Sequence, residues 1–154
     1  MSEDARFEDG ADRPLRLRAL DGDDLRVLSS LVQDGVFAAS EMRWDRRRRR
    51  FGVLINRFRW EDAGRAGGFE RVQAVLAIED VTAVRSQGID PRDGGQVLSL
   101  LALEFVPGDD GTGTVMLTLA GDGAVAVDVE ALEVVLRDVT RPWASPSGRA
   151  PSHE

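Results

Sequence analysis

The sequence predicts an α+β domain built on a strongly bent antiparallel sheet, or a partly closed barrel, of about seven strands. From Val36 to Asp128 the chain breaks into short apolar segments, most of which have the two-residue alternation of half-buried strands. Turn sequences such as AGRAGG, DPRDGG and GDG separate them, and these connections are too short for parallel crossovers. A stretch with helical periodicity on each side predicts one helix near each end of the domain.

The expected domain spans residues 14–144. An acidic tail (residues 1–13) precedes it and a tail rich in Pro, Ser and Gly (residues 145–154) follows it, and both are expected to be disordered. The first strand is expected in PLRLRAL, where Leu15 and Leu17 alternate with Arg16 and Arg18.

The next segment, DGDDLRVLSSLVQDG, predicts a helix of about three turns, because four apolar residues share one helical face. These are Leu25, Leu28, Leu31 and Val32. Asp21 is placed to cap the helix, and Gly35 is placed to end it.

The chain then stays strand-like in seven segments, which are expected to supply roughly six more strands: VFAASEMRW, FGVLINRFRW, FERVQAVLAI, VTAVRS, QVLSLLALEFV, GTVMLTLA and AVAV. One hairpin can be placed by its register. With a four-residue loop at Arg46–Arg49, Trp44 lies opposite Phe51 and Asp45 lies opposite Arg50. An aromatic pair and an ion pair would then fix the register.

The last expected element is a C-terminal amphipathic helix in DVEALEVVLRDVTRPW, packed on the sheet. Asp128 is its candidate cap, and Pro142 lies beyond its end. Its apolar face would comprise Val129, Leu132, Val135, Leu136 and Val139. An antiparallel barrel closed by a final helix is similar in topology to a pleckstrin-homology-like barrel, and this analogy implies no ligand.

The composition excludes several kinds of chemistry. The chain contains no cysteine, lysine or tyrosine, and its single histidine, His153, lies in the C-terminal tail. Thiolate nucleophiles, lysine Schiff bases and histidine general bases therefore have no residue within the domain. The chain also has no nucleotide-binding glycine pattern, and the acidic segment DGDD lacks the glutamate that a calcium loop needs at the position of Val32. We therefore expect no cofactor and no metal site, and an enzyme is the less favoured class.

The expected setting is the cytoplasm. The first residues are acidic where a signal peptide needs a basic region, and no apolar stretch approaches membrane-spanning length. We therefore expect a soluble protein that does not bind membranes. The sequence does not decide between a monomer and a homodimer, because an exposed edge strand can pair with a second copy.

A run of arginines is the most visible feature of the sequence. Eight arginines and one acid lie between Arg43 and Arg59, although the chain as a whole has a net charge of −7. A solvated hairpin tip is the favoured interpretation, and an anion patch for phosphates or nucleic acid is the alternative. The candidate anion patch comprises Arg43, Arg46, Arg47, Arg48, Arg49 and Arg50.

Two short segments contain the candidate binding residues. In INRFRWE, arginines alternate with aromatic residues, and a bulge near Asn56 or a strand buried on both faces would explain the pattern. In VRSQGID, polar residues gather at a strand end before Gly88, which is expected at positive φ. The candidates are Asn56, Arg57, Arg59, Trp60, Arg85, Ser86 and Gln87.

Several of these segments together resemble a known family. The succession of ALDGDDLRVLSSLVQDGV, FGVLINRFRWE, VTAVRSQGID, VLSLLALEF and the stretch from GTVMLTLA to RPW is similar to small alphaproteobacterial proteins classed as a domain of unknown function, DUF2948-like. The resemblance covers about Leu15 to Trp143. It implies a bacterial single-domain protein without an assigned activity or cofactor.

Three hypotheses about function follow. The first is a non-catalytic binding or accessory module that holds a protein or peptide partner. The second is binding of nucleic acid or another polyanion through the arginines of the Arg43–Arg59 hairpin. The third is an enzyme that uses Asp or Glu side chains in a pocket.

Overall fold

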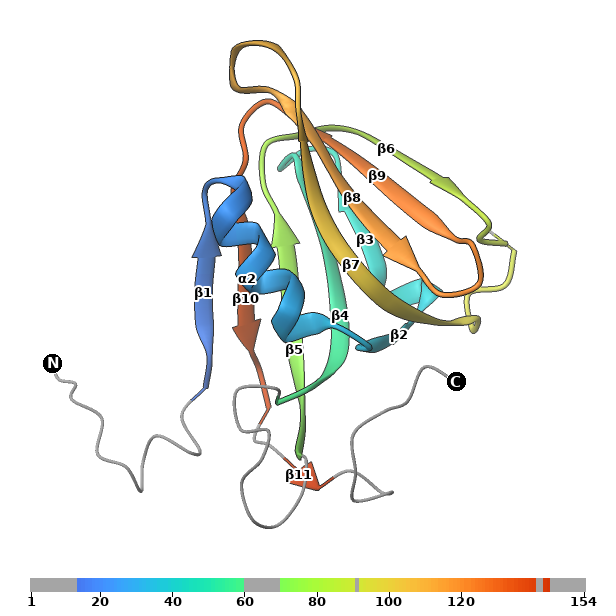
Figure 1. The fold of residues 1–154 in the computed structure, drawn as a ribbon. Helices are drawn as coiled ribbons and strands as arrows, with labels where there is room; N and C mark the ends of the chain where they lie inside the picture. Colours follow the sequence, from blue (N-terminus) through green and yellow to red (C-terminus); the bar gives the residue numbers. More distant parts are fainter. Residues whose placement is uncertain (1–13, 60–69, 91, 141–142, 145–154) are drawn as a thin grey trace, which may run out of the picture.

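A computed structural model of the chain describes residues 14–59, 70–90, 92–140 and 143–144. The two tails and Trp60 lie outside these residues. The described part contains one α-helix and eleven strands, all paired antiparallel (Figure 1). An α+β class built on an antiparallel sheet is therefore confirmed, while the expected number of about seven strands was too low.

The helix is α2 (Gly22–Val32), and short 3-10 turns lie at Ala39–Glu41 and Asp109–Gly111. The strands are β1 (Arg16–Ala19), β2 (Val36–Ala38), β3 (Met42–Asp45), β4 (Arg50–Phe58), β5 (Glu70–Ile78), β6 (Val81–Gln87), β7 (Val97–Pro107), β8 (Gly113–Leu119), β9 (Ala124–Val129), β10 (Val134–Asp138) and β11 (Trp143–Ala144).

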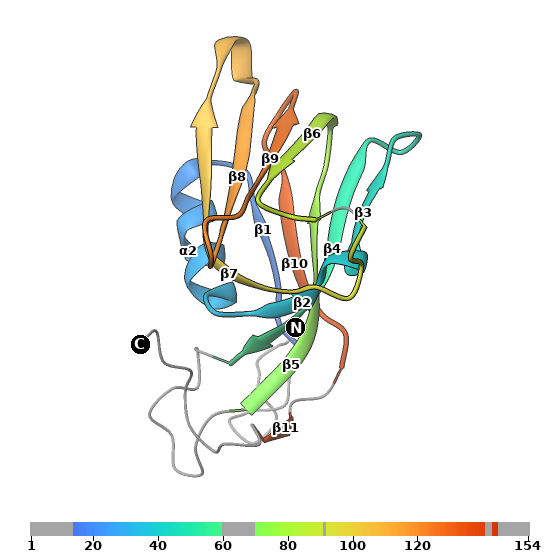
Figure 2. The ribbon, with the colours of Figure 1, turned by 90° about the vertical axis from the view of Figure 1, so that its right-hand side faces the viewer.

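The strands follow the order β1-β10-β5-β4-β2-β7-β8-β9-β6, with β3 added to β4 and β11 added to β5. The sheet folds back on itself but does not close, because β1 and β6 remain at the two ends of this order. Figure 2 shows the β7–β8 and β3–β4 hairpins projecting from the same end of the molecule. The short strand β2 joins two halves of this order, β1-β10-β5-β4 and β7-β8-β9-β6, since Val36 pairs with Asn56 of β4 and with Ser99 of β7.

A sharp corner forms the second junction between the halves. At this corner β5 leads into β6 and β9 leads into β10, so the β5–β10 pair continues as the β6–β9 pair. Asp80 lies in the turn between β5 and β6, with φ of 57°. Two backbone hydrogen bonds hold the corner: Glu79 N donates to Glu133 O at 3.0 Å, and Glu130 N donates to Asp80 O at 3.0 Å.

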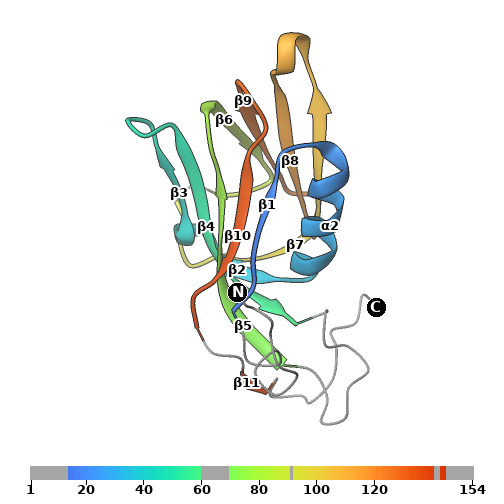
Figure 3. The same ribbon diagram turned by 90° about the vertical axis from the view of Figure 1, so that its left-hand side faces the viewer.

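Helix α2 lies between β1 and β7, as Figures 1 and 3 show. Asp21 caps it as expected, since its side chain accepts a hydrogen bond of 2.8 Å from Asp24 N. The helix ends at Val32 rather than at Gly35, and Asp34 is the residue with positive φ, at 64°. Gly35 is needed for packing instead, because a Cβ there would lie 2.6 Å from Ile55 Cδ1.

The core lies between the two halves of the sheet and forms a single cluster with the apolar face of α2. Alternate residues of each long strand point into it, which is why the sequence alternates. Its most deeply buried members include Leu25, Leu28, Ile55, Leu76, Ile78, Leu103, Leu117 and Leu136.

The prediction of a C-terminal helix was wrong, because Asp128–Trp143 contains the end of β9, all of β10 and the start of β11. Within β10, Val134, Leu136 and Asp138 point inward, which is a two-residue period. The segment is rich in β-branched valine, and β10 has β1 on one side and β5 on the other. This pairing on both sides favours a strand over the helical period.

The analogy with a pleckstrin-homology-like barrel depended on that closing helix, so it loses its basis. The only α-helix in the described part of the chain is α2, which lies near the start of the domain. None of the described residues form a helix that is long and apolar enough to cross a membrane.

Candidate functional site

A shallow hollow of about 490 Å³ lies on the outward face of β6, β9, β8 and β7. Its floor is β9, where Ala124 and Ala126 point outward. Arg85 of β6 lies opposite Ala126, which in turn lies opposite Met116 of β8, and Gln87 lies opposite Ala124. Small side chains between longer ones therefore make a trough along β9.

A second hollow of about 350 Å³ adjoins the first, since Val106 and Thr114 line both. It continues past Asp128 to Glu130. We call the two together the β9 groove, which runs from Ala124 to Glu130. At about 3.3 Å per residue the groove is roughly 20 Å long, which is longer than a compact small molecule requires.

A polar network crosses the middle of the β9 groove. Asp128 Oδ1 accepts hydrogen bonds from Arg85 Nη2 at 2.6 Å and from Thr114 Oγ1 at 2.7 Å. The three residues belong to β9, β6 and β8, so they fix three neighbouring strands to one another. The charge of Arg85 already has a carboxylate partner there.

The structure brings together three of the residues expected to bind a ligand. Arg85, Ser86 and Gln87 all line the first hollow. Gly88 follows them with φ of 73°, so its expected positive φ is confirmed. Asn56 lies in the other half of the sheet, between Val36 and Gln73, and does not line the groove.

Arg57 and Arg59 are buried rather than available to a ligand. Arg57 is fully buried, and it forms a two-point ion pair with Asp138 at 3.0 Å and 3.0 Å. Arg59 is 3 % exposed, and its Nη1 lies 2.8 Å from Glu70 Oε1. Both arginines therefore hold strands together.

The expected bulge near Asn56 is absent, because β4 pairs with β5 in unbroken register from Phe51 to Phe58. Instead, Arg57, Phe58 and Arg59 are buried in succession. This end of β4 is thus buried on both faces, which is the alternative that explained its mixed pattern.

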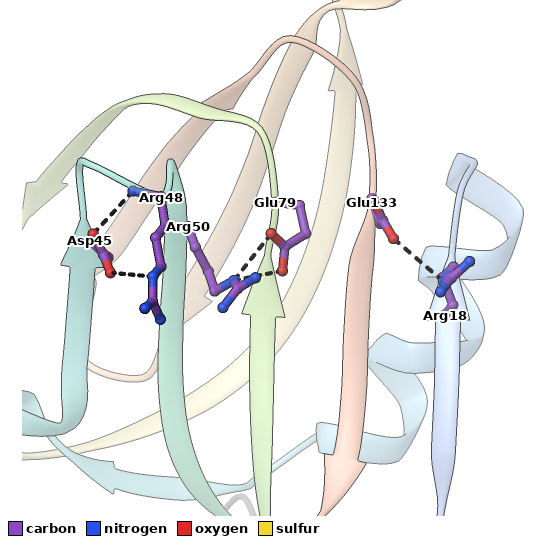
Figure 4. A network of polar contacts seen from close by, with 6 residues as sticks. All are labelled: Arg18, Asp45, Arg48, Arg50, Glu79 and Glu133. Carbon is purple, nitrogen blue, oxygen red and sulfur yellow. Dashed lines mark hydrogen bonds and ion pairs between the residues drawn. The ribbon is translucent and has the colours of Figure 1, made fainter.

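The register of the arginine hairpin is as expected, with Trp44 opposite Phe51 and Asp45 opposite Arg50. The expected ion pair between Asp45 and Arg50 is absent. Asp45 Oδ2 lies 3.9 Å from Arg48 Nε, and Arg50 Nε reaches Glu79 at 2.8 Å and 3.1 Å (Figure 4). Arg50 finds its carboxylate on β5 because β4 and β5 lie side by side.

Two further arginines at the hairpin tip, Arg46 and Arg49, also have partners. The guanidinium of Arg46 lies over the ring of Trp44, 4.5 Å from its centroid. Arg49 forms an ion pair with Glu130, and this hydrogen bond raises the pKa of Arg49 above its ordinary value. Of the candidate anion patch, the side chains of Arg43 and Arg47 have no hydrogen bond, ion pair or ring contact in the described part of the chain.

Comparison with known families gives a match over residues 15–153, to the family described as "Protein of unknown function (DUF2948)". The chain belongs to the DUF2948 family. No curated protein matches it, and no solved structure matches it. For this DUF2948 chain, the chemistry of the β9 groove is therefore the available guide to function.

Within the described ranges of the DUF2948 chain, no group of three or more His, Cys, Asp or Glu side chains lies where it could hold a metal ion. The acids of the groove are instead engaged with neighbours on the sheet, as Asp128 is with Arg85.

Sequence reasoning missed the floor and the far wall of the β9 groove. The signal was present in GDGAVAVDV, where Ala124 and Ala126 occupy the outward positions of a strand whose inward positions are valines. Small outward residues mark a depression only when the neighbouring strands are known. Those neighbours are β6 and β8, and β6 lies about forty residues away along the chain.

Proposed function

We propose that this DUF2948 protein is a non-catalytic binding module that holds an extended peptide segment of a protein partner in the β9 groove. The observation that carries the proposal is the alanine floor of β9, Ala124 and Ala126, set between longer side chains of β6 and β8. An extended chain fits a long, shallow trough, whereas compact ligands favour enclosed pockets.

The chemistry of the walls supports a peptide ligand. Ser86 and Gln87 supply hydroxyl and amide groups that can bond to a peptide backbone. Met116 and Val106 supply apolar contact on the other side, and Val106 is 53 % exposed. Methionine adapts to different side chains, so this wall suits a partner with small or medium apolar residues.

The electrostatics favour a peptide of low charge. Arg85 is paired with Asp128 at 2.6 Å, so an incoming carboxylate would have to displace a partner already in place. A neutral segment can bind without breaking that pair. We therefore expect uncharged residues opposite the centre of the groove.

The proposal is tested by filling the groove. The probe is a displayed library of random peptides selected on the intact protein, followed by affinity measurement with a synthetic copy of the selected peptide. Ala126→Arg should weaken binding by roughly tenfold or more, because a long side chain would occupy the floor. Ala131→Arg is the matched control, since Ala131 is exposed in the turn between β9 and β10 and lines neither hollow of the groove.

Selection that returns no peptide, or equal binding by the Ala126→Arg protein, would contradict the proposal. A photoreactive residue at Gln87 in producing cells gives an independent readout. It should form an adduct with one partner protein, and Ala126→Arg should abolish this adduct. An adduct formed only with a second copy of this chain would identify a homodimer interface instead.

We also infer that the protein works in a bacterial cytoplasm. The absence of cysteine from all 154 residues supports a reducing compartment, where disulfides are rare. The resemblance to alphaproteobacterial proteins supports the bacterial origin. Fractionation of producing cells should place the protein in the cytosol, and recovery from the periplasm would contradict this inference.

A further inference from the structure

A second surface, on the opposite half of the sheet, has unpaired positive charge. Arg16 of β1 lies directly opposite Arg137 of β10, and both are exposed. Neither side chain has a hydrogen bond or an ion pair in the part of the chain that the structure describes. Like charges placed directly opposite each other destabilise a sheet, so this pair has an energetic cost in the free protein.

The cross-strand registers place further residues on this face. Arg137 lies opposite Val75, and Val75 lies opposite Leu54. The adjacent row runs from Arg18 through Val135 and Ala77 to Gly52 and Arg43. Figure 3 shows the strands that carry these rows, β1, β10, β5, β4 and β3, side by side.

We call this surface the arginine face. Its centre is apolar and half-buried, and its arginines lie on both sides of that centre. The apolar residues are Leu54, Val75, Ala77 and Val135, and the arginines are Arg16, Arg43 and Arg137.

The neighbouring belt of charges, nearer the hairpin tip, differs from the arginine face. There each arginine has a carboxylate: Arg50 pairs with Glu79 at 2.8 Å, and Arg18 reaches Glu133 at 3.4 Å (Figure 4). Arg16, Arg43 and Arg137 have no such partner among the described residues. Within the described ranges these three charges therefore lack a carboxylate, and an acidic ligand can supply one.

We propose that the arginine face docks an acidic polypeptide segment that also has apolar residues. Arg16 and Arg137 lie on adjacent strands, about 4.8 Å apart, close enough for both guanidinium groups to bond one carboxylate. The apolar residues of the segment would cover Val75 and Val135. Arg43, on the far side of the apolar centre, would bond a second carboxylate.

Nucleic acid fits this surface less well. The outward residues at its centre are aliphatic, such as Leu54 and Val75, and offer no ring for a base to stack on. The acids Glu79 and Glu133 border the face, and the chain has a net charge of −7. A long polyanion would be repelled beyond the few unpaired arginines.

The test uses a synthetic peptide of alternating glutamate and leucine as the probe, with a glutamine–leucine peptide and a short DNA duplex for comparison. Arg16→Gln/Arg137→Gln should weaken binding of the glutamate peptide by roughly tenfold or more at low salt. The control, Arg26→Gln/Arg92→Gln, also removes two positive charges, but from exposed arginines that are paired with Asp23 and Asp90. It should bind the glutamate peptide like the wild type.

A second readout separates lost binding from lost folding. Because the substitution removes a like-charge pair, the Arg16→Gln/Arg137→Gln protein should unfold at the same or a higher temperature than the wild type while binding less. Three outcomes would overturn the proposal: no binding of the glutamate peptide by the wild type, equal losses in both double variants, or tighter binding of the duplex than of the peptide.

Discussion

Arg57 and Asp138 form a two-point ion pair inside the protein, with Nε 3.0 Å from Oδ1 and Nη2 3.0 Å from Oδ2. Their side chains are 0 % and 3 % exposed. The same carboxylate accepts a hydrogen bond of 2.9 Å from Leu15 N. One aspartate therefore joins the end of β4, the end of β10 and the residue that leads into β1.

Asp138→Ala should lower the free energy of unfolding by about 3–5 kcal/mol, because it leaves a buried guanidinium without its carboxylate. Denaturation in urea measures the loss. Asp128→Ala is the control, since it breaks an ion pair with the exposed Arg85 and a hydrogen bond from Thr114, and it should cost about 1–2 kcal/mol. Similar losses in the two variants would show that the buried pair has no special role.

Gly35→Ala should destabilise the protein by about 1–3 kcal/mol, because the added Cβ would lie 2.6 Å from Ile55 Cδ1 and 3.0 Å from Val32 O. Thermal unfolding measures the effect. Ile55→Val removes the nearer atom, so Gly35→Ala should cost less in an Ile55→Val background than in the wild type, although Ile55→Val itself should cost about 0.5–1.5 kcal/mol. An equal cost of Gly35→Ala in the two backgrounds would place the strain elsewhere.

Gly121→Ala tests backbone conformation without a packing change. Gly121 has φ of 79°, and a Cβ there would meet nothing within 4 Å. The left-handed conformation alone should cost about 1–2 kcal/mol. Gly22→Ala also adds a Cβ in open space but without positive φ, so it should be neutral or slightly stabilising. Chemical denaturation measures the free energy of unfolding of both variants.

Glu79→Gln should have a small effect that depends on salt. Its partner Arg50 is 48 % exposed, so loss of the pair should cost about 0.2–1 kcal/mol. The difference from the wild type should shrink in about 1 M salt, where surface charges are screened. Urea titrations at low and high salt measure this, and an unchanged difference would indicate packing rather than charge.

Local patterns were sufficient for the features that depend on neighbours in the sequence. The cap by Asp21 and the pairing of Trp44 with Phe51 were both predicted, and both depend on residues a few positions apart. The segment from Arg85 to Gln87 was singled out because polar residues precede a glycine turn, and it does line a groove.

The features that were missed depend on partners far away in the sequence. Val134, Leu136 and Asp138 fit a strand, but the same segment also fits a helical face, and only the pairing with β1 and β5 decides between them. Arg57 shares the inward alternation of β4, which suggested a ligand or a bulge. Its actual partner is an acid on the inward side of another strand, 81 residues away.

The contact between Leu15 and Asp138 joins residues 123 positions apart. During synthesis at about 5–20 residues per second, Asp138 would be made roughly 4–16 s after Arg57. Until then β1 has no strand to pair with, and Leu15 N lacks the carboxylate that accepts its hydrogen bond. Completion of the fold therefore waits for the late strand β10, and a chain released from the ribosome before this strand is made would expose an open strand edge to the chaperones and proteases of the cell.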